Sequence, residues 1–546
     1  MTAPAATRTH CPYCALQCAM DLAPAPDGGL SVRPAPFPTN RGGLCRKGWT
    51  STEVLTTPDR LTRPLLRKDR TGPLTEVDWD TALDHIAERL LALRAESGPD
   101  SVAVFGSGGL TNEKSYLLGK FARLALGTSQ IDYNGRFCMS SAAAAGNRAF
   151  GLDRGMPFPL TDLAASDVVL LAGANPAETM PPMMGHLSAP RLIVIDPRRT
   201  ATARVALDNG GLHLAPRPGT DTALALSLLH AVHAQGWVDR SFVDSRTTGF
   251  AAAWDQAAVW WPEHAELITG VPAAQVRAAA DLLGRAAHAR SAHVLTGRGT
   301  EQHAKGTDTV SAWINLALAL GLPGRAGSGY GCITGQGNGQ GGREHGQKAD
   351  QLPGYRRIDD PAARAHVAGV WGVDPDALPG PGRSAFELLD ALGTPDGPRA
   401  MLLFGSNPVV SAPHSTRVRS RLADLDLLVA ADFVLSETAA MADVVLPVAQ
   451  WAEESGTMTN LEGRVLRRRR AVSPPAGVRT DLQVLQDLAT RLGQPAARFP
   501  TDPDTVLVEL GAASAEGAAD YSGVTPDRLA GQEALYWPVP RDAPPT

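Results

Sequence analysis

Residues 167–176 read Asp-Val-Val-Leu-Leu-Ala-Gly-Ala-Asn-Pro, and residues 401–408 read Met-Leu-Leu-Phe-Gly-Ser-Asn-Pro. Each is an apolar run of strand length that ends in a Gly-x-Asn-Pro turn. Each is followed by a second apolar run that ends in an acid, at Asp196 and at Asp432. One such turn is weak evidence, because Gly-x-Asn turns often only end strands. Two matching copies indicate an internal repeat, and buried strands of this kind are typical of parallel α/β sheets.

The flanking sequence alternates helix and strand patterns, which extends the α/β prediction. Residues 79–95 carry apolar side chains at i, i+3, i+4 and i+7, with Asp78 or Asp80 as the cap, and predict a helix. Residues 101–105 predict a strand that ends in a glycine-rich turn, and residues 112–126 predict another helix. Ligands tend to bind at such turns, where the strands of α/β sheets end.

The two Gly-x-Asn-Pro turns suit nucleotide phosphates, because a glycine turn offers free backbone N–H groups. The acid after the next strand suits ribose hydroxyls or the edge of a guanine. Two copies therefore predict two nucleotide sites, one at Asn175 and one at Asn407. The loop from Pro218 to Asp221 is expected to belong to the first site.

Four of the six cysteines lie near the N-terminus with the spacing Cys-x2-Cys-x3-Cys-x26-Cys. Four thiolates satisfy a four-iron cluster or a structural zinc ion. Three ligands within eight residues and a distant fourth favour the iron–sulfur cubane, although zinc stays open. Lys47 is either an ordinary surface lysine or a bridge from the cluster toward a second cofactor. The predicted ligands are Cys11, Cys14, Cys18 and Cys45.

Cys138 stands apart from the other cysteines, in the stretch Asn-Gly-Arg-Phe-Cys-Met-Ser-Ser of residues 134–141. A lone cysteine in apolar surroundings is usually a small buried side chain. A thiolate is also a strong ligand for a soft or high-valent metal, so both interpretations stay open at this point. Cys332 is expected to be a buried thiol.

Residues 327–343 form the most glycine-dense stretch of the chain. Such a stretch can be a mobile linker. Its Gln, Asn and Arg residues favour a ligand-lining loop, in which glycine permits a close approach of the backbone.

Composition excludes several classes of protein. A net charge of −5 over 546 residues gives no reason to expect nucleic-acid binding. No run of about 18 apolar residues exists, so no membrane span is expected. The first ten residues contain neither an apolar signal core nor a twin arginine, which predicts no export. Few, clustered cysteines suit metal ligands in a reducing compartment, so a cytoplasmic location is expected.

Several motifs, in order, resemble the molybdopterin oxidoreductases of the dimethyl-sulfoxide-reductase superfamily. They are CPYCALQC (11–18) and NRGGLCRKG (40–48), RLTRPLLR (60–67), WDTAL (79–83), GRFCMSSA (135–142), TGQGNGQGGRE (334–344), SNPVVS (406–411), SETAAMADVVLP (436–447) and EESGTMTNLEGR (453–464). The resemblance runs from about Cys11 to about Leu492 and is strongest to the assimilatory nitrate reductase branch.

The resemblance implies one 4Fe-4S cluster and a molybdenum bis(molybdopterin guanine dinucleotide). It identifies Cys138 as the molybdenum thiolate, Met139 as its neighbour in the active site, and Lys47 as the residue between cluster and pterin. Gln336 and Asn338 are expected to face the pterins. One guanosine end is assigned to Gly173, Asn175, Glu178, Asp196, Thr200, Gly219 and Asp221, and the other to Gly405, Asn407, Asp432, Ser436 and Glu437.

The activity implied is reduction of nitrate to nitrite by oxygen-atom transfer, with electrons that arrive through the cluster from ferredoxin or an NADH-linked flavoprotein. Formate dehydrogenases of this family carry His after the metal ligand, where this chain has Met139. The alternatives are another oxo-transfer or formate-type reaction, or a non-catalytic electron-transfer or assembly subunit of the same fold.

The resemblance also implies a multidomain α/β fold with an N-terminal iron–sulfur domain and two doubly wound nucleotide-binding domains. Full-length members continue into a β-barrel domain that covers both pterins, and this chain stops at Thr546, before it. Three explanations are open for this difference: a second chain supplies that domain, the site is open, or the chain is a damaged copy. The expected divisions are 1–56 for the iron–sulfur domain with a returning segment at about 450–500, 57–139 with 335–449 for one pterin-binding domain, 140–334 for the other, and 500–546 for a C-terminal tail.

Overall fold

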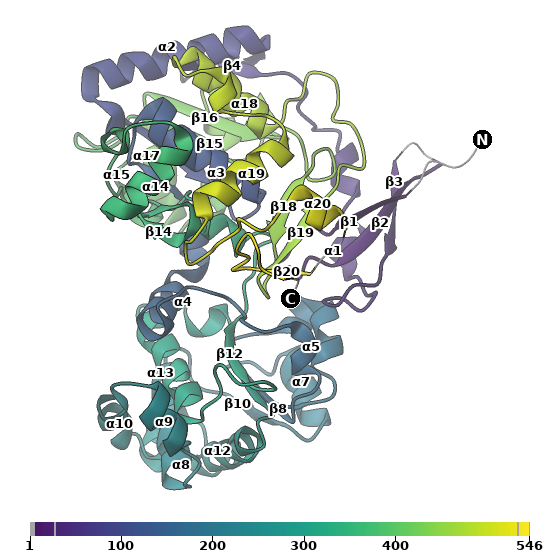
Figure 1. Ribbon diagram of the computed structural model, residues 1–546, viewed down its shortest axis with the longest axis vertical. Coiled ribbons are helices and arrows are strands. Elements are labelled where there is room, and N and C mark those ends of the chain that lie inside the picture. Colours follow the sequence, from purple (N-terminus) through teal and green to yellow (C-terminus); the bar gives the residue numbers. More distant parts are fainter. Residues whose placement is uncertain (1–5, 27–28, 532–533, 545–546) are drawn as a thin grey trace.

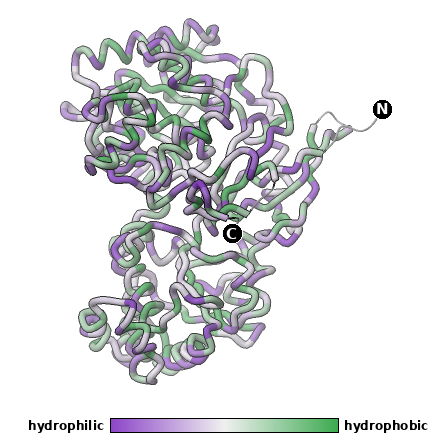
Figure 2. The backbone as a smooth tube through the Cα atoms, in the orientation of Figure 1, coloured by the Kyte–Doolittle hydropathy of each residue, from purple (hydrophilic) through white to green (hydrophobic). Residues whose placement is uncertain are grey.

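The computed structural model describes residues 6–26, 29–531 and 534–544. The ends of the expected segments 1–56 and 500–546 therefore lie partly outside the described residues. Figure 1 shows two α/β bodies, one above the other, with a small N-terminal sheet beside them. Hydrophobic stretches run through the interior of both bodies in Figure 2.

The upper body is built on a seven-stranded sheet in the order β5-β4-β17-β16-β15-β6-β7. Strands β17 to β7 in that order are parallel, whereas β4 and β5 add an antiparallel edge. The strands come from two distant parts of the chain: β4 (Leu65–Arg67), β5 (Leu74–Glu76), β6 (Val102–Gly106) and β7 (Ile131–Tyr133), then β15 (Ala400–Phe404), β16 (Leu427–Asp432) and β17 (Val444–Pro447).

Helices pack on both faces of this sheet. The first expected helix is confirmed as α2 (Trp79–Ser97), and Asp78 caps it by accepting from the Thr81 backbone N–H at 2.7 Å. Burial of Leu83, Ile86 and Leu90 on one face of α2 covers the sheet. The other helices are α3 (Asn112–Lys120), α14 (Pro361–Trp371), α15 (Ala385–Ala391), α16 (Pro408–Ser411) and α17 (Ser415–Ala423), with a π-helical turn, η3 (Phe121–Leu126), after α3.

The lower body is built on a five-stranded parallel sheet in the order β10-β9-β8-β11-β12. Its strands are β8 (Val168–Ala172), β9 (Arg191–Ile195), β10 (Leu212–Leu214), β11 (Ala292–Thr296) and β12 (Gly329–Cys332). Its helices are α5 (Leu160–Leu163), α6 (Pro176–Thr179), α7 (Ala201–Asp208), α8 (Asp221–Ala234), α9 (Arg240–Arg246), α10 (Phe250–Ala258), α11 (Pro262–Thr269), α12 (Ala273–His288) and α13 (Gly306–Ala319). Helix α4 (Gly135–Phe150) lies between the two bodies in Figure 1 and packs on α13.

The internal repeat is confirmed in backbone geometry. Gly173 and Gly405 have φ of +64° and +63°, in the left-handed region that favours glycine. Asn175 and Asn407 follow with φ/ψ of −125°/68° and −124°/73°. A Cβ on Gly173 would lie 2.3 Å from the backbone nitrogen of Thr300, so the first turn also needs glycine for space.

The N-terminal sheet consists of β1 (Thr7–His10), β2 (Ala19–Pro24) and β3 (Leu30–Pro34), followed by α1 (Arg46–Trp49). The cysteine loop lies between β1 and β2. Cys11 and Cys18 belong to a buried cluster that includes Met183, so this loop packs against the lower body.

The segment expected to return to the iron–sulfur domain divides between two parts of the fold. Strand β19 (Arg464–Arg468), paired with β18 (Gly456–Thr459), contacts β1. Helix α18 (Asp481–Arg491) packs instead on α2 and α3 of the upper body.

The segment after residue 500 is packed rather than loose. Helix α19 (Pro503–Ser514) packs on α3 and α14, α20 (Pro526–Ala530) contacts β19, and β20 (Leu535–Tyr536) pairs with β19. Trp537 is fully buried, with the Arg154 guanidinium 4.8 Å from its ring. Apolar side chains spaced among Ala and Pro account for this packing.

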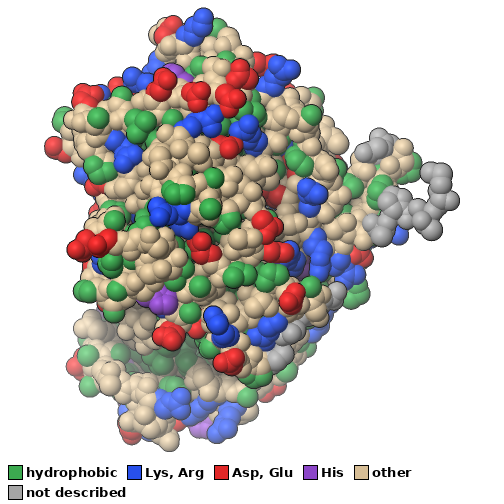
Figure 3. All heavy atoms as spheres, turned by 45° about the horizontal axis from the view of Figure 1, so that its top comes forward, with side chains coloured by type: hydrophobic (Ala, Val, Ile, Leu, Met, Phe, Trp, Pro, Cys, Tyr) green, Lys and Arg blue, Asp and Glu red, His purple; other side chains and the backbone are tan. Residues whose placement is uncertain are grey.

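None of the helices in the described residues is both long enough and apolar enough to cross a membrane. Acidic and basic side chains are interspersed on the face shown in Figure 3.

Candidate functional site

The four N-terminal cysteines converge in one place. Burial raises the pKa of Cys11 to about 12, and the thiols of Cys14 and Cys45 add to that rise. Burial likewise raises the pKa of Cys18, again with contributions from the other three thiols. All four are free thiols. Mutual influence of this kind requires that the four sulfurs face a common space.

Four thiols that face one space can hold a cluster or a single metal ion. A cubane spreads its four cysteine ligands around a larger body, whereas zinc binds four sulfurs at about 2.3 Å.

Lys47 lies on α1 and is exposed. Its charge partly offsets the rise that burial causes in the pKa of Cys14, so the ammonium group is close to the cysteine site. The structure therefore places Lys47 beside the predicted cluster ligands.

The glycine-rich loop joins the cysteine loop to Cys138. Ala15 donates its backbone N–H to Gly335 O at 3.0 Å, and Gln17 Nε2 donates to Gly337 O at 2.5 Å. A Cβ on Gly335 would lie 3.9 Å from Cys138 Sγ. These contacts contradict the mobile-linker alternative, because the backbone of this loop is held against both cysteine sites.

The two amides of this loop differ in what they contact. Gln336 is half-buried and forms a backbone bridge with Cys14. Asn338 is fully buried, donates to Leu110 O at 2.8 Å and to Asn112 Oδ1 at 2.9 Å, and accepts from Thr459 N at 2.7 Å. The Asn338 amide thus bonds protein groups, and the expectation that Asn338 faces a pterin stays a prediction.

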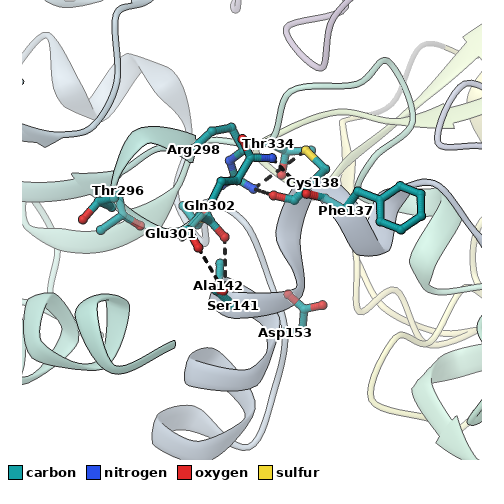
Figure 4. A network of polar contacts seen from close by, with 12 residues as sticks. Phe137, Cys138, Ser141, Ala142, Asp153, Thr296, Arg298, Glu301, Gln302 and Thr334 are labelled. Atoms are coloured by element: carbon teal, nitrogen blue, oxygen red, sulfur yellow. Dashed lines mark hydrogen bonds and ion pairs between the residues drawn. The ribbon is translucent and has the colours of Figure 1, made fainter. Parts of the chain in front are cut away.

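Cys138 lies in the first turn of α4, in a network drawn in Figure 4. Arg298 donates from Nη1 to the Cys138 carbonyl at 2.8 Å, and the same nitrogen lies 3.9 Å from Cys138 Sγ. Arg298 Nη2 donates to Cys332 Sγ at 2.8 Å and forms an ion pair with Glu301. Glu301 Oε2 accepts from Ala142 N at 3.0 Å, which anchors the network to α4.

Arg298 remains a cation in this network. Burial lowers its pKa, but the electrostatic influence of Cys332, Glu301 and Cys138 raises it by more, so the net shift is upward. Cys332 is buried, as expected, and burial raises its pKa to about 12. Of the two cysteines, Cys138 alone lines an open cavity, together with Ser141, Gln302 and His303.

A second cavity opens on the other side of the first turn of α4. Met139, 5% exposed, lines it with Arg136, Arg343 and Lys348. Arg343 is buried and forms an ion pair with Asp153 at 2.9 Å. Asp153 and Asp350 line the same cavity, and Asp350 pairs with Arg136 at 2.6 Å. Lys348 is thus the lining cation without an ion pair among the described residues, and it can attract a small anion or a phosphate-bearing ligand.

In the first nucleotide turn, Asn175 is held by a residue not expected from the sequence. Its Oδ1 accepts from Thr202 Oγ1 at 2.7 Å. Burial raises the pKa of Asp221, and the charge of Asp196, which is also buried, raises it further. The two acids therefore lie near each other. Thr200 caps α7 by accepting from Ala203 N at 3.2 Å, which is a structural role.

Two further residues assigned to this turn are exposed. Glu178 lies in the first turn of α6, and Gly219, with a φ of +83°, lies in the loop before α8.

The second nucleotide turn repeats this arrangement. Asn407 Oδ1 accepts from Thr438 Oγ1 at 2.6 Å, and its Nδ2 donates to the exposed Glu437 at 2.7 Å. Asp432 accepts from Ser436 Oγ at 2.6 Å. The five residues assigned to this end, Gly405 among them, therefore converge on one turn.

One atom of the second turn is left for a ligand. Ser406 Oγ is shielded from solvent and has no hydrogen-bond partner in the protein. A hydroxyl inside a Gly-Ser-Asn turn fits a phosphate oxygen, so the residues present fit a nucleotide-bearing cofactor.

Sequence reasoning missed Arg298, Glu301, Thr202 and Thr438. The two threonines carried a signal, because each lies six positions after the acid of its repeat, Asp196 or Asp432. The Arg298 and Glu301 pair carried none, since its partners are about 160 residues away along the chain.

Comparisons with known proteins agree with this geometry. A family model described as molybdopterin oxidoreductase matches residues 60–491, and one described as the molybdopterin oxidoreductase Fe4S4 domain matches residues 4–56. The assimilatory nitrate reductase catalytic subunit of Bacillus subtilis (strain 168) is 42% identical over 97% of this chain and 75% of its own length. Formate dehydrogenase H of Escherichia coli (strain K12) is 33% identical over 97% of this chain and 73% of its own length.

The acetylene hydratase from Pelobacter acetylenicus has a similar solved structure, with a TM-score of 0.76 and 22% identity. The match covers 92% of this chain and 71% of that one. At this identity the likeness concerns the fold alone.

Proposed function

Because the chain belongs to the molybdopterin oxidoreductase family, we propose that it reduces nitrate to nitrite at a molybdenum ion held by Cys138. The observation that carries the proposal is a pair of cavities at one helical turn, one lined by Cys138 and the other by Met139 with Arg343 and Lys348. The relative from Bacillus subtilis, whose name states nitrate reduction, is 42% identical over 97% of this chain.

The chain's own residues position the reactants. When bound, the molybdopterin cofactor supplies two-electron oxygen-atom transfer. Cys138 supplies the protein thiolate, and Arg298 holds the carbonyl of that residue in place. Arg343 and Lys348 attract the nitrate anion, and the Asp153 carboxylate keeps the Arg343 guanidinium in one orientation.

The form of the pterin is part of the proposal. We propose two guanine dinucleotides, one bound at each Gly-x-Asn-Pro turn. Gly173, Asn175, Glu178, Asp196, Thr200, Gly219 and Asp221 serve one, and Gly405, Asn407, Asp432, Ser436 and Glu437 serve the other. Gln336 and Asn338 approach the pterins from the glycine-rich loop.

Electrons reach this site through the four-cysteine cluster. Lys47 and the contacts between residues 335–337 and the cysteine loop supply a link between the proposed cluster ligands and Cys138. We propose ferredoxin or an NADH-linked flavoprotein as the donor and a cytoplasmic location.

Formate oxidation is the second candidate, because formate dehydrogenases are also among the relatives. The residue after the metal ligand disfavours it, since Met139 offers no proton-accepting group. A non-catalytic subunit is disfavoured by the presence of Cys138, both nucleotide turns and the cationic cavity.

Nitrate reduction with reduced viologen tests the proposal. Wild-type protein that contains molybdenum should produce nitrite, and Cys138→Ser should lower turnover by about a hundredfold or more while the cluster remains. Cys332→Ser is the control, because a hydroxyl can replace its hydrogen bonds to Arg298 and Glu301. Molybdenum-loaded protein that consumes formate and ignores nitrate would contradict the proposal, as would full turnover in Cys138→Ser.

A further inference from the structure

Arg468 is a buried cation without a partner. It ends β19, is 3% exposed, and forms none of the ion pairs found among the described residues. Its Nε and Nη2 atoms are shielded from solvent and have no hydrogen-bond acceptor. A guanidinium buried in this way is strongly unfavourable unless a negative charge lies nearby.

The cysteine site lies next to this guanidinium. Strand β19 contacts β1, and Cys11 directly follows the last residue of β1. Ala452 and Ala471, which flank the β18–β19 hairpin, pack in the buried cluster that contains Cys11 and Cys18. These contacts place the end of β19, where Arg468 lies, beside the first predicted cluster ligand.

Two buried carboxylates, Glu454 and Glu113, act on Arg468 through their charge. Glu454 uses Oε1 in an ion pair with Lys114, which also binds Asp481 at 2.5 Å, while Glu454 Oε2 has no hydrogen-bond partner in the protein. Glu113 accepts from Thr457 through both its backbone N–H, at 2.8 Å, and its hydroxyl, at 2.7 Å. Neither carboxylate comes within 4.0 Å of Arg468 as an ion pair, so neither accounts for its free N–H groups.

We propose that Arg468 is the counter-charge of the iron–sulfur cluster and raises its reduction potential. A cluster with four thiolate ligands carries net negative charge, and reduction adds one electron to it. A fixed cation favours the reduced form, because net charge and hydrogen bonds to sulfur both set the potential of such clusters. The inference rests on the four cysteines as cluster ligands and not on nitrate as the substrate.

The first experiment measures the cluster's midpoint potential by anaerobic redox titration, with electron paramagnetic resonance as the readout. Arg468→Met should shift the equilibrium at least tenfold toward the oxidised cluster, which is about 59 mV lower for a one-electron couple. Arg468→Lys, which keeps the charge, should recover most of the shift. Arg470→Met removes the same charge at an exposed position and should leave the potential unchanged.

An unchanged potential in Arg468→Met with full iron content would overturn the inference. A merely structural role predicts that result, since packing alone does not move a potential in a charge-dependent way. If wild-type protein contains no iron–sulfur cluster, the ligand assignment fails instead, which separates the two claims.

A second experiment needs no loss of the buried cation. Wild-type protein labelled with ¹⁵N-arginine should show a ¹⁵N coupling to the reduced cluster in pulsed electron paramagnetic resonance. The coupling should disappear in labelled Arg468→Lys. Its absence from wild-type protein would overturn the inference even where Arg468→Met fails to fold.

Discussion

Arg298 holds Cys138 by its backbone, with Nη1 2.8 Å from the Cys138 carbonyl oxygen and 3.9 Å from its sulfur. The arginine comes from η5 (Arg298–Thr300), at the end of β11, and the cysteine from α4. The position of the proposed metal ligand therefore depends on how a strand of the lower body meets the helix between the bodies.

Substitution of Arg298 should weaken the metal site. Arg298→Gln removes the cation and leaves Glu301 buried without its ion pair, so molybdenum content or nitrate turnover should fall about 10–100-fold. Molybdenum analysis and the viologen assay measure this. Arg277→Gln, on the exposed surface of α12, is the control and should match wild type. Equal metal content and turnover in Arg298→Gln would show that the thiol holds its position unaided.

The cysteine site should contain iron and not zinc. Purified protein is expected to be brown, with a broad band near 400 nm that dithionite bleaches and about four iron atoms per chain. Cys18→Ser, at a buried ligand position, should lose most of this iron. A colourless protein with one zinc ion per chain would contradict the assignment.

Both nucleotide turns should be occupied in the complete protein. Acid treatment should release about two GMP per molybdenum, because each turn cradles one phosphate group. Asn407→Leu, which breaks the hydrogen bonds to Thr438 and Glu437, should lower the yield of intact cofactor. A wild-type ratio of one would mean that one of the two turns only ends a strand and binds no nucleotide.

His293 should make stability depend on pH. Burial lowers its pKa from 6.5 to about 4, and Ser166 Oγ lies 2.7 Å from Nδ1. Between pH 6.5 and about 4, His293 binds a proton in the unfolded chain but stays neutral in the folded protein. The free energy of unfolding is therefore highest above pH 6.5 and falls as the pH is lowered toward 4. The loss between pH 7.5 and pH 4.5 is about 2.5 kcal/mol.

Urea unfolding at those two pH values checks the His293 prediction. His293→Gln cannot take up the proton, so its free energy of unfolding should fall less than that of wild type over the same range. The other buried histidines are present in both proteins and cancel in the comparison. Parallel pH dependence in the two proteins would contradict the prediction.

Trp537 should stabilise the upper body. Its side chain is fully buried among residues that surround the seven-stranded sheet. Trp537→Ala should lower the free energy of unfolding by about 3–5 kcal/mol, through lost burial and the cavity left behind. Trp261→Ala, at a residue that is 48% exposed, should change it by less than about 0.5 kcal/mol.

The paired turns could be predicted in detail because their residues have few alternatives. A left-handed backbone at Gly173 and Gly405 and a capping Asn both leave a visible pattern in the sequence. The convergence of the four cysteines was also predictable, because their spacing is typical of the ligands of one shared metal site.

The network around Arg298 and the packing after residue 500 were not predictable. A guanidinium can donate hydrogen bonds to any nearby oxygen or sulfur, so nothing in the sequence links Arg298 to Cys138. The partners of Asn338 were not predictable either, because an amide in a glycine-rich loop suits a ligand and a buried protein partner equally well. The apolar residues of α19 lie among Ala and Pro without a clear period, which hid their burial.

The interrupted seven-stranded sheet has a consequence for the order in which a newly made chain can fold. Strand β6 ends at Gly106, and its neighbour β15 begins only at Ala400. At 5–20 residues per second, a ribosome needs roughly 15 to 60 seconds to bridge that interval. The five-stranded sheet, by contrast, is finished within the interval. On the ribosome the lower body can therefore fold before the upper sheet is complete. During that time the edge of β6 that pairs with β15 remains exposed.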